Sequence, residues 1–360
     1  MSLPDLPGLL STRELTRTVD TIADQQLPSG MIPWFPGGHA DPWNHVESAM
    51  ALLVGGRRAE ADRAYDWLVA NQRDDGAWHH YYVADRVEQD KLEANVTAYV
   101  ATGVWHHWLL TGDRGALETM WASVERAIDF VLDLQTPRGE IIWARHPDGT
   151  PWSFALLTGS SSICHSLRCA IAIAEELGAE RPDWELSLAR LARIIRLRPD
   201  GAFAPKNRWA MDWYYPVLCG AITGDDGREH LSARYDTFVM PGLGVRCVSD
   251  RPWVTAAETC ECALAYLGIG DEHTARELFG WAQSMRVDDG RYWTGTVHPE
   301  GVHFPADEMS TYTAAAVVLT ADALGGATNG AALFTRHDTL PPMLELDDDF
   351  EVEFDRSPEH

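Results

Sequence analysis

The stretch Gln72-Arg73-Asp74-Asp75-Gly76-Ala77-Trp78 joins two apolar segments through a polar turn that contains a glycine and is followed by an aromatic residue. Related turns recur at 26–34, 135–143, 198–203 and 288–293. Repetition of one phrase indicates one supersecondary unit used several times. Because helix-like segments flank each turn, we predict an αα-hairpin as the unit, and about six of them fit the chain.

Two kinds of helical segment alternate along the chain. Amphipathic segments with charge on one face are predicted at 12–26, 59–72, 116–134, 184–197, 228–238 and 274–285. Less charged segments, richer in small residues, are predicted at 42–54, 91–110, 156–177, 209–222, 255–268 and 307–324. Two concentric rings would bury the second kind on all sides and leave the first facing water. We therefore predict an all-α fold, an (α/α)6 toroid in one domain over 1–340, followed by an acidic tail at 341–360.

Composition limits the classes of partner. The formal charge is −25 and the pI is near 4.8, so the surface would repel a phosphate backbone or an anionic membrane. The sequence has no apolar run of about 20 residues and no secretory start, which predicts a cytoplasmic protein. The six cysteines lie mostly in apolar stretches without metal-type spacing, which favours reduced thiols. We expect a small-molecule substrate, no metal, no cofactor, no nucleic acid and no membrane insertion.

In a toroid of this kind the loops that enter the inner helices converge on a central funnel, so polar residues at the starts of those helices are candidates for chemistry. The candidate catalytic carboxylates are Asp212, Glu308, Glu47 and Glu258. The candidate substrate-binding residues are Trp43, His45, Glu93, Asn95, Arg208, Trp209, Tyr214, Trp253 and Tyr312. The strongest signal is the aromatic cluster at 208–215, because a purely structural cluster would not need Asp212.

Structural roles compete with several of these assignments. Asp41 before Pro42 fits a helix N-cap followed by proline at the first helical position. Glu93 and Asn95 open a helix, where an acidic residue complements the helix dipole. Glu258 and Glu261 lie on one helix face. Two such carboxylates either share a proton or bind a positive group, and the structural alternative is one solvent-facing acid and one paired acid.

Three segments resemble a known family. The residues at 105–113, 121–130 and 147–151 are similar to the central hairpins of six-hairpin glycosidases, especially glucoamylase- and trehalase-type enzymes of glycoside hydrolase family 15. The resemblance implies an (α/α)6 barrel and inverting hydrolysis by a general acid and a general base. Its base position matches Glu308, whereas the segment at 156–161, where the family carries its acid, has no carboxylate.

A second resemblance competes with the first. The Gln-x-x-x-Gly-x-Trp phrase and the segment at 37–43 are similar to repeats of the terpenoid cyclase and protein prenyltransferase toroid, and actinobacterial proteins of this kind are often labelled prenyltransferase. The repeat indicates a toroid rather than isoprenoid chemistry. The nearest run to an Asp-x-Asp-Asp acid is in the tail, at 347–349, and the sequence has no Asp-x-Cys.

The polar funnel favours a sugar over a hydrocarbon, because buried carboxylates and amides need hydroxyl partners. We therefore predict a carbohydrate-active enzyme of the glycoside hydrolase type. Asp212 or Glu47 would act as the acid and Glu308 or Glu258 as the base. Trp43, Trp209 and Trp253 would stack on sugar rings, and Arg208 would clamp a carboxylate or phosphate. The alternatives are a prenyltransferase or cyclase, a sugar epimerase that uses His45, His165 or His303, and a noncatalytic toroid.

Overall fold

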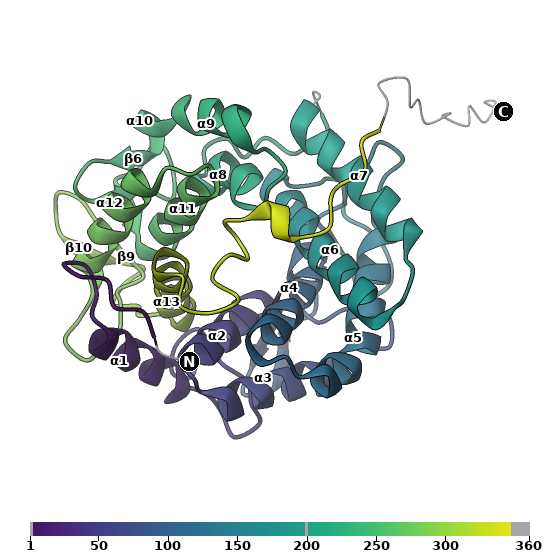
Figure 1. Cartoon of the computed structure of the whole chain (residues 1–360), viewed down its shortest axis with the longest axis horizontal. Helices are drawn as coiled ribbons and strands as arrows, with labels where there is room; N and C mark the ends of the chain where they lie inside the picture. The colour runs from purple at the N-terminus through teal and green to yellow at the C-terminus, as the bar shows by residue number, and fades with distance from the viewer. Residues whose placement is uncertain (1–2, 199–200, 347–360) are drawn as a thin grey trace.

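The computed structural model describes residues 3–198 and 201–346, which form two concentric rings of helices (Figure 1). The inner ring consists of α2 (Pro42–Val54), α4 (Ala94–Thr111), α6 (Leu157–Leu177), α8 (Met211–Leu218), α11 (Ala256–Gly268) and α13 (Thr311–Gly325). The outer ring consists of α1 (Thr12–Ala23), α3 (Arg58–Asn71), α5 (Arg114–Leu132), α7 (Pro182–Leu197), α9 (Gly224–Ser232) and α12 (Glu272–Ala282), and a short α10 (Tyr235–Phe238) follows α9. Helix α13 packs against α2 and closes the ring. The predicted (α/α)6 toroid is confirmed.

The two rings differ in the way the sequence analysis anticipates. Helix α13 is buried along nearly its whole length, because its alanine, valine and threonine side chains let neighbours approach from several sides. Helix α1 instead buries one stripe, which includes Leu15, Val19 and Ile22. It starts with a capping box between Ser11 and Glu14, which satisfies the first amide groups of the helix.

The recurrent turn joins neighbouring outer helices. The side-chain Nε2 of Gln72 donates to Gly76 O at 2.9 Å and to Ser123 O of α5 at 2.8 Å. Gln26 makes the same pair of bonds to Gly30 O and to Glu60 O of α3, and Gln135 repeats the pattern with α7. Each glutamine therefore fastens its own turn to the next outer helix, which is the physical basis of the repeat.

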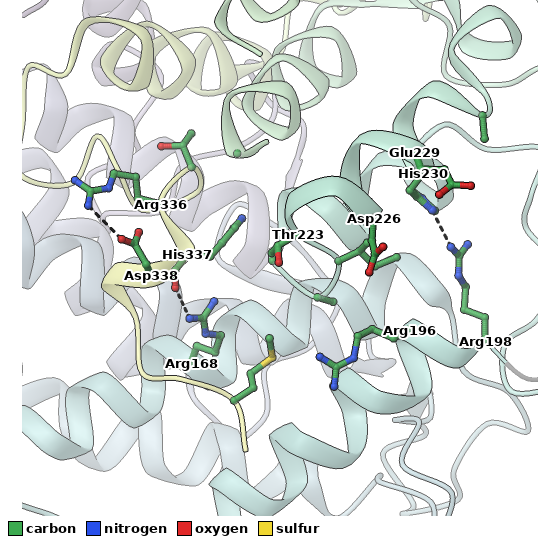
Figure 2. Close-up of a pocket in the computed structure, with 17 residues that line it drawn as sticks. Arg168, Arg196, Arg198, Thr223, Asp226, Glu229, His230, Arg336, His337 and Asp338 are labelled. Atoms are coloured by element: carbon green, nitrogen blue, oxygen red, sulfur yellow. Dashed lines mark hydrogen bonds and ion pairs between the residues drawn. The ribbon is translucent and has the colours of Figure 1, made fainter. Parts of the chain in front are cut away.

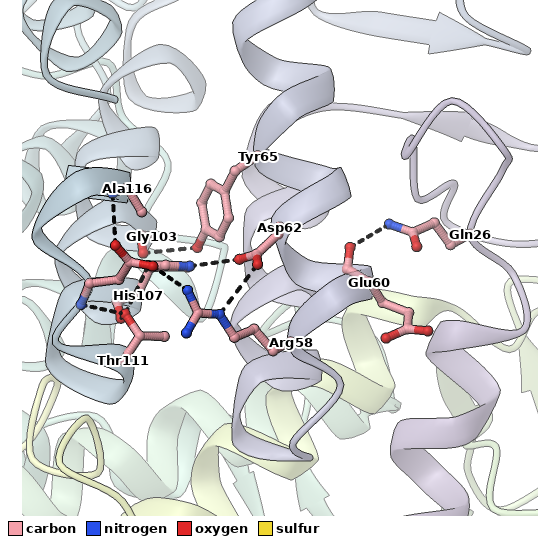
Figure 3. Close-up of polar contacts among 10 residues, drawn as sticks. Gln26, Arg58, Glu60, Asp62, Tyr65, Gly103, His107, Thr111 and Ala116 are labelled. Carbon is pink, nitrogen blue, oxygen red and sulfur yellow. Dashed lines mark hydrogen bonds and ion pairs between the residues drawn. The ribbon is translucent and has the colours of Figure 1, made fainter. Parts of the chain in front are cut away.

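A charged cluster adds a second link between outer helices (Figure 3). Arg58 of α3 contacts Asp62 on the same helix at 3.3 Å and also pairs with Asp113, the N-cap of α5. His107 of the inner helix α4 reaches Asp62 with its Nε2 at 2.9 Å from Oδ1. The cluster therefore joins α3, α4 and α5 where the chain passes from the end of α4 into α5.

Short antiparallel strands lie in the loops that enter the inner helices. They are β1 (His39–Ala40), β2 (Tyr81–Val83), β3 (Arg86–Gln89), β4 (Leu92–Glu93), β5 (Ala144–Arg145), β6 (Val239–Met240), β7 (Gly244–Val245), β8 (Trp253–Thr255), β9 (Gly295–Val297) and β10 (Val302–Phe304). Their orders are β1-β2-β3, β10-β9-β8, β4-β5 and β6-β7. All of them precede inner helices, so they shape one end of the barrel.

Three predicted helical segments differ from the observed helices, and strand pairing explains the first difference. The segment predicted at 91–110 becomes helical only at Ala94, because Leu92 and Glu93 pair with β5. The segment predicted at 307–324 starts at Thr311, because a turn with Asp307 at φ +54° precedes it. The weak segment at 228–238 divides into α9 and α10. The middles of the predicted helices agree better than their ends, as is usual for helix assignments.

The opposite end of the barrel is crossed by the C-terminal segment after α13, drawn in yellow in Figure 1. His165 of α6 donates from Nε2 to Leu333 O at 3.1 Å and stacks on Phe334 at 4.9 Å. His165 is therefore held by this segment as a core histidine. Residues 347–349 of the predicted acidic tail, with the rest of 347–360, lie outside the described residues.

Candidate active site

A pocket of about 240 Å³ opens at the N-terminal ends of α2, α4, α6 and α8. Five of the residues predicted from the sequence line it, namely Trp43, Glu93, Asn95, Trp209 and Asp212. They come from three separate segments, which only the toroid brings together. The pocket lies at the end of the barrel where the funnel site is predicted, and Leu156 and Met211 add apolar walls.

Asp212 is the second residue of α8 and is largely buried. Its Oδ1 accepts a hydrogen bond from the Thr158 hydroxyl at 2.7 Å and one from the Thr158 amide at 3.3 Å. Burial raises the pKa of Asp212, and the hydrogen bonds from Thr158 oppose that shift. Both bonds go to Oδ1, so Oδ2 can carry a proton without losing either of them.

Glu93 ends β4 and precedes the first residue of α4. Lys91 Nζ lies 3.0 Å from its Oε2, and His80 Nδ1 lies 3.2 Å from the same oxygen. Burial raises the pKa of Glu93, and the ammonium of Lys91 lowers it. Lys91 also lies over the Trp143 ring at 4.0 Å. Glu93 is thus a paired carboxylate in the wall of the pocket, suited to accept bonds from a hydroxyl group.

Glu258 lies in the first turn of α11, at the same end of the barrel. Its Oε2 accepts a short hydrogen bond from the Thr255 hydroxyl, and burial raises the pKa of the carboxyl group. Burial raises the pKa of Tyr312 of α13, and the nearby charges of Glu308 and Glu258 raise it further. Glu258 therefore occupies a position across the ring from Glu93.

The structure places Glu308 differently from the prediction. It lies in the turn before α13 and not on the helix, and Thr294 Oγ1 donates to its Oε1 at 3.1 Å. It lines a separate pocket of about 280 Å³ with Phe35 and Arg291. Burial raises its pKa. Glu308 is therefore at the rim, away from the pocket that contains Asp212.

Glu47 lies one helical turn below Trp43, whose Nε1 donates to its Oε1 at 2.8 Å. Tyr99 donates to the same oxygen at 3.1 Å. Glu47 borders an internal cavity of about 30 Å³ that also touches Glu261, which accepts hydrogen bonds from Tyr214 and from Tyr215. Neither carboxyl group lines the Asp212 pocket, and Glu47 accepts a hydrogen bond from the Trp43 ring that does.

The pH dependence of stability provides a test of this buried pair. Burial raises the pKa of Glu47 to about 7 and that of Glu261 to about 8, from 4.5, so the native state holds protons that the unfolded state has released. The contribution of this pair to the free energy of unfolding is therefore fully present below pH 4.5, and it is lost as the pH rises through 7 and 8. Glu47→Gln removes one of the two groups that titrate in this range. We therefore expect its melting temperature to fall less than that of the wild type between about pH 5 and about pH 8.

The control for this measurement is Glu300→Gln, which changes an exposed glutamate in the turn between β9 and β10. It alters the net charge of the protein by the same amount. Its pH profile should match that of the wild type. Equal slopes for Glu47→Gln and wild type would contradict the assignment of the buried pair.

Three predicted substrate-binding residues have other contacts. His45 is fully buried; its Nδ1 accepts from Ile32 N at 3.1 Å and its Nε2 donates to Ala64 O at 2.9 Å, and burial lowers its pKa to about 4. Tyr214 is fully buried against Glu261. Arg208 pairs with Asp250 at 2.7 Å in an exposed loop. The structure thus places none of the three in the wall of the Asp212 pocket.

The remaining aromatic candidates lie around the same end of the barrel. Trp209 is 43% exposed beside Asp212. Trp253 stacks on Phe304 at 4.5 Å, and Tyr312 meets Trp34 edge-on at 5.0 Å. Trp209 is therefore the most exposed of these rings, with the Arg208 guanidinium 5.5 Å from its centroid, whereas Trp253 and Tyr312 pack against protein rings.

The sequence analysis anticipated Asp41 as the N-cap of α2 but missed the aromatic side chains around it. Asp41 is its N-cap, and its carboxylate accepts from Asn44 N at 3.0 Å and from Trp34 Nε1 at 2.7 Å. His39 lies 4.3 Å from Trp34 and 4.1 Å from Tyr81, measured between ring centroids. The sequence analysis used the segment at 37–43 as evidence for a repeat, so the ring contacts of His39 with Trp34 and Tyr81 were not predicted.

Other site types find little support within the described ranges. No group of three or more His, Cys, Asp or Glu side chains there is arranged to hold a metal ion. All six cysteines are buried free thiols. No helix in the same ranges has the length and apolarity to cross a membrane.

The chain is similar in sequence to a curated protein and similar in fold to several solved structures. No family model matches the chain. The MMP endo-(1,4)-3-O-methyl-alpha-D-mannosidase of Mycolicibacterium hassiacum is 50% identical over 344 residues, which is 96% of this chain and 95% of the relative. Its name denotes a hydrolase that acts on glycosidic bonds.

Among solved structures, a glycosidase in complex with glucose matches with a TM-score of 0.68 and 14% identity, over 88% of this chain and 99% of the other. A family 63 mannosylglycerate hydrolase of Thermus thermophilus matches with a TM-score of 0.67 and 12% identity, over 84% of this chain and 99% of the other. At such identities these structures support the fold alone. The matches do not confirm the resemblance to family 15 or to prenyltransferases. The toroid and the predicted class, a glycosidase-like hydrolase, are confirmed.

Proposed function

The chain belongs to the same family as the M. hassiacum mannosidase, and on that premise we propose that it hydrolyses internal α-(1,4) bonds between 3-O-methyl-D-mannose units. An endo-acting enzyme needs a site that is open on both sides of the scissile bond. The Asp212 pocket lies at the open end of the barrel, with the exposed Trp209 ring beside it. That position suits a chain which continues beyond the reacting sugar.

The observation that carries this proposal is the mixed lining of the pocket. Trp43, Leu156 and Met211 give apolar surface, while Glu93 and Asp212 give hydrogen-bond acceptors. An O-methyl group removes a hydroxyl donor and adds apolar surface that gains free energy on burial, about 0.8 kcal/mol per buried methylene-sized group. A pocket with apolar walls beside carboxylates therefore suits a sugar that keeps some hydroxyl groups and carries a methyl ether at another position.

We assign Asp212 as the general acid and Glu258 as the general base. Asp212 lines the pocket with its pKa raised, which favours the protonated form that an acid needs. Glu258 starts a helix at the same end of the barrel. Glu47 lies beneath Trp43 and Glu308 lies in a different pocket, so of the four carboxylates predicted from the sequence these two fit best.

The proposed reaction uses one proton donor and one proton acceptor. Asp212 protonates the glycosidic oxygen as the bond from this oxygen to C1 breaks, so the leaving sugar departs with a hydroxyl group. A water molecule loses a proton to Glu258 as its oxygen bonds to C1. A water between base and sugar corresponds to inversion at the anomeric carbon, for which the carboxyl groups stand about 6.5–9.5 Å apart.

The test is hydrolysis of a purified α-(1,4)-linked oligosaccharide of 3-O-methyl-mannose, with the unmethylated oligosaccharide of equal length beside it. We expect internal cleavage into shorter oligosaccharides, seen by mass spectrometry. The kcat/KM should be roughly fourfold higher for the methylated chain for each methyl contact in the pocket, because one such contact gives about 0.8 kcal/mol. Release of single sugars only would contradict an endo mode. Absence of cleavage in both chains would contradict the proposed substrate.

A further inference from the structure

A cavity of about 880 Å³ lies away from the Asp212 pocket (Figure 2). Its walls come from the second half of α6, the ends of α7 and α11, the loop between α8 and α9, α9 itself and the C-terminal segment. Thr158 of α6 contacts Asp212, whereas Arg168 borders this cavity ten residues later, about 15 Å along the helix. The cavity therefore belongs to the opposite end of the barrel.

Arg168 is a buried cation at this cavity, with only 3% of its surface exposed. Its Nε donates to Pro341 O at 3.0 Å, and its Nη2 donates to the main-chain oxygens of His337 and Leu340. Its Nη1 has no hydrogen-bond partner among the described residues. No carboxylate there forms an ion pair with it, although a buried charge without a counter-ion is costly.

Arg196, in the last turn of α7, adds a second cation to the wall. It is exposed, and no carboxylate of the described ranges lies within ion-pair distance of it. Figure 2 shows Arg168 and Arg196 along the same side of the cavity. Two guanidinium groups without carboxylate partners are unusual in a protein whose formal charge is −25.

The other charged groups at the cavity nearly cancel. Arg336 pairs with Asp338 at 3.2 Å, and Arg198 Nη2 lies 2.8 Å from His230 Nδ1. The remaining carboxylates are Asp226 and Glu229 of α9, across the cavity from Arg168. An anion would thus be attracted to the side that holds Arg168 and Arg196 and repelled from the side of α9.

We propose that this cavity binds a small oxyanion, the phosphate or carboxylate group of a metabolite, between Arg168 and Arg196. Arginine forms two parallel hydrogen bonds to either group, which makes it the side chain best suited to such ligands. The anion would provide the counter-ion that Arg168 lacks. The site is separate from the Asp212 pocket, so the proposal does not depend on the proposed hydrolysis.

The test is the melting temperature and isothermal titration calorimetry of the full chain with inorganic phosphate, with acetate, and with sodium chloride at equal ionic strength. We expect phosphate or acetate to raise the melting temperature in a saturable manner, which chloride does not reproduce. If phosphate alone raises the melting temperature, the site binds a phosphate group, and if acetate alone does, it binds a carboxylate. Arg196→Gln should weaken the apparent affinity roughly tenfold, because it removes charge-assisted hydrogen bonds from an exposed residue.

The matched control is Arg276→Gln, which changes an exposed arginine of α12 that pairs with Glu272 at 2.7 Å. It should bind the anion as the wild type does. Arg168→Lys is a second variant, since it keeps the buried charge but loses the paired donors of the guanidinium group. If neither ion exceeds the effect of chloride, or if Arg196→Gln binds as tightly as Arg276→Gln, the proposal is wrong.

Discussion

Asp212→Asn is expected to lower kcat by roughly 10²–10⁴-fold, the contribution of a positioned general acid. Asparagine has nearly the same shape as aspartate, and its side-chain oxygen can still accept the hydrogen bond that Thr158 donates to Asp212 Oδ1 at 2.7 Å. The variant should therefore fold and bind substrate with little change in KM. What it lacks is a proton to give to the leaving oxygen. The measurement is steady-state hydrolysis of the methylated oligosaccharide, with circular dichroism to verify the fold.

A change of leaving group separates loss of the acid from general damage to the site. An aryl glycoside whose phenol has a low pKa needs no proton to depart, so Asp212→Asn should recover much of its rate on that substrate. Glu258→Gln should not recover, because the attacking water still lacks a base. Glu300→Gln, on an exposed turn at the same end of the barrel, should hydrolyse both substrates at the wild-type rate. A rate for Asp212→Asn on the oligosaccharide within about tenfold of wild type would rule out the assigned role.

The sequence predicted the helices well where local signals mark their ends. Helix α2 starts and ends where the sequence analysis placed it, because Asp41 caps it and Pro42 occupies its first position. Helix α13 starts later than predicted, since its preceding turn follows the β9–β10 hairpin. Strand pairing between distant segments leaves no local signal in a single sequence. For this reason the errors concentrate in the loops that shape the site.

The sequence showed which helix starts would border the candidate site. It did not show which face of each helix points toward that site. Trp43 and His45 are two residues apart on α2, and only Trp43 lines the pocket. In an inner helix both faces are buried against protein, so hydrophobic periodicity does not show which face points to the funnel. The pairing of Glu47 with Glu261 was missed for a similar reason. Their helices α2 and α11 are far apart in sequence, and only the closed ring joins their side chains at one cavity.

Gly76→Ala is expected to destabilise the protein by roughly 3 kcal/mol, an effect of the repeat turn rather than of the site. Gly76 has φ +90°, which L side chains rarely adopt, and a Cβ atom there would lie 2.2 Å from Arg126 O of α5. The backbone of the turn would have to move away from α5. That movement would also break the bond from Gln72 to Ser123 O, which fastens the turn to α5. The melting temperature measures the loss.

Gly149→Ala is the matched control for this effect. Gly149 has φ +94°, close to that of Gly76, but no heavy atom lies within 4 Å of the position of its Cβ. Gly149→Ala should therefore lower the free energy of unfolding only by the cost of placing alanine in the left-handed backbone conformation, about 1 kcal/mol. The difference between the two variants isolates the contact between the turn and the next outer helix. If both variants lose the same stability, the turns do not hold the outer ring together, and the recurrent glycine reflects backbone conformation only.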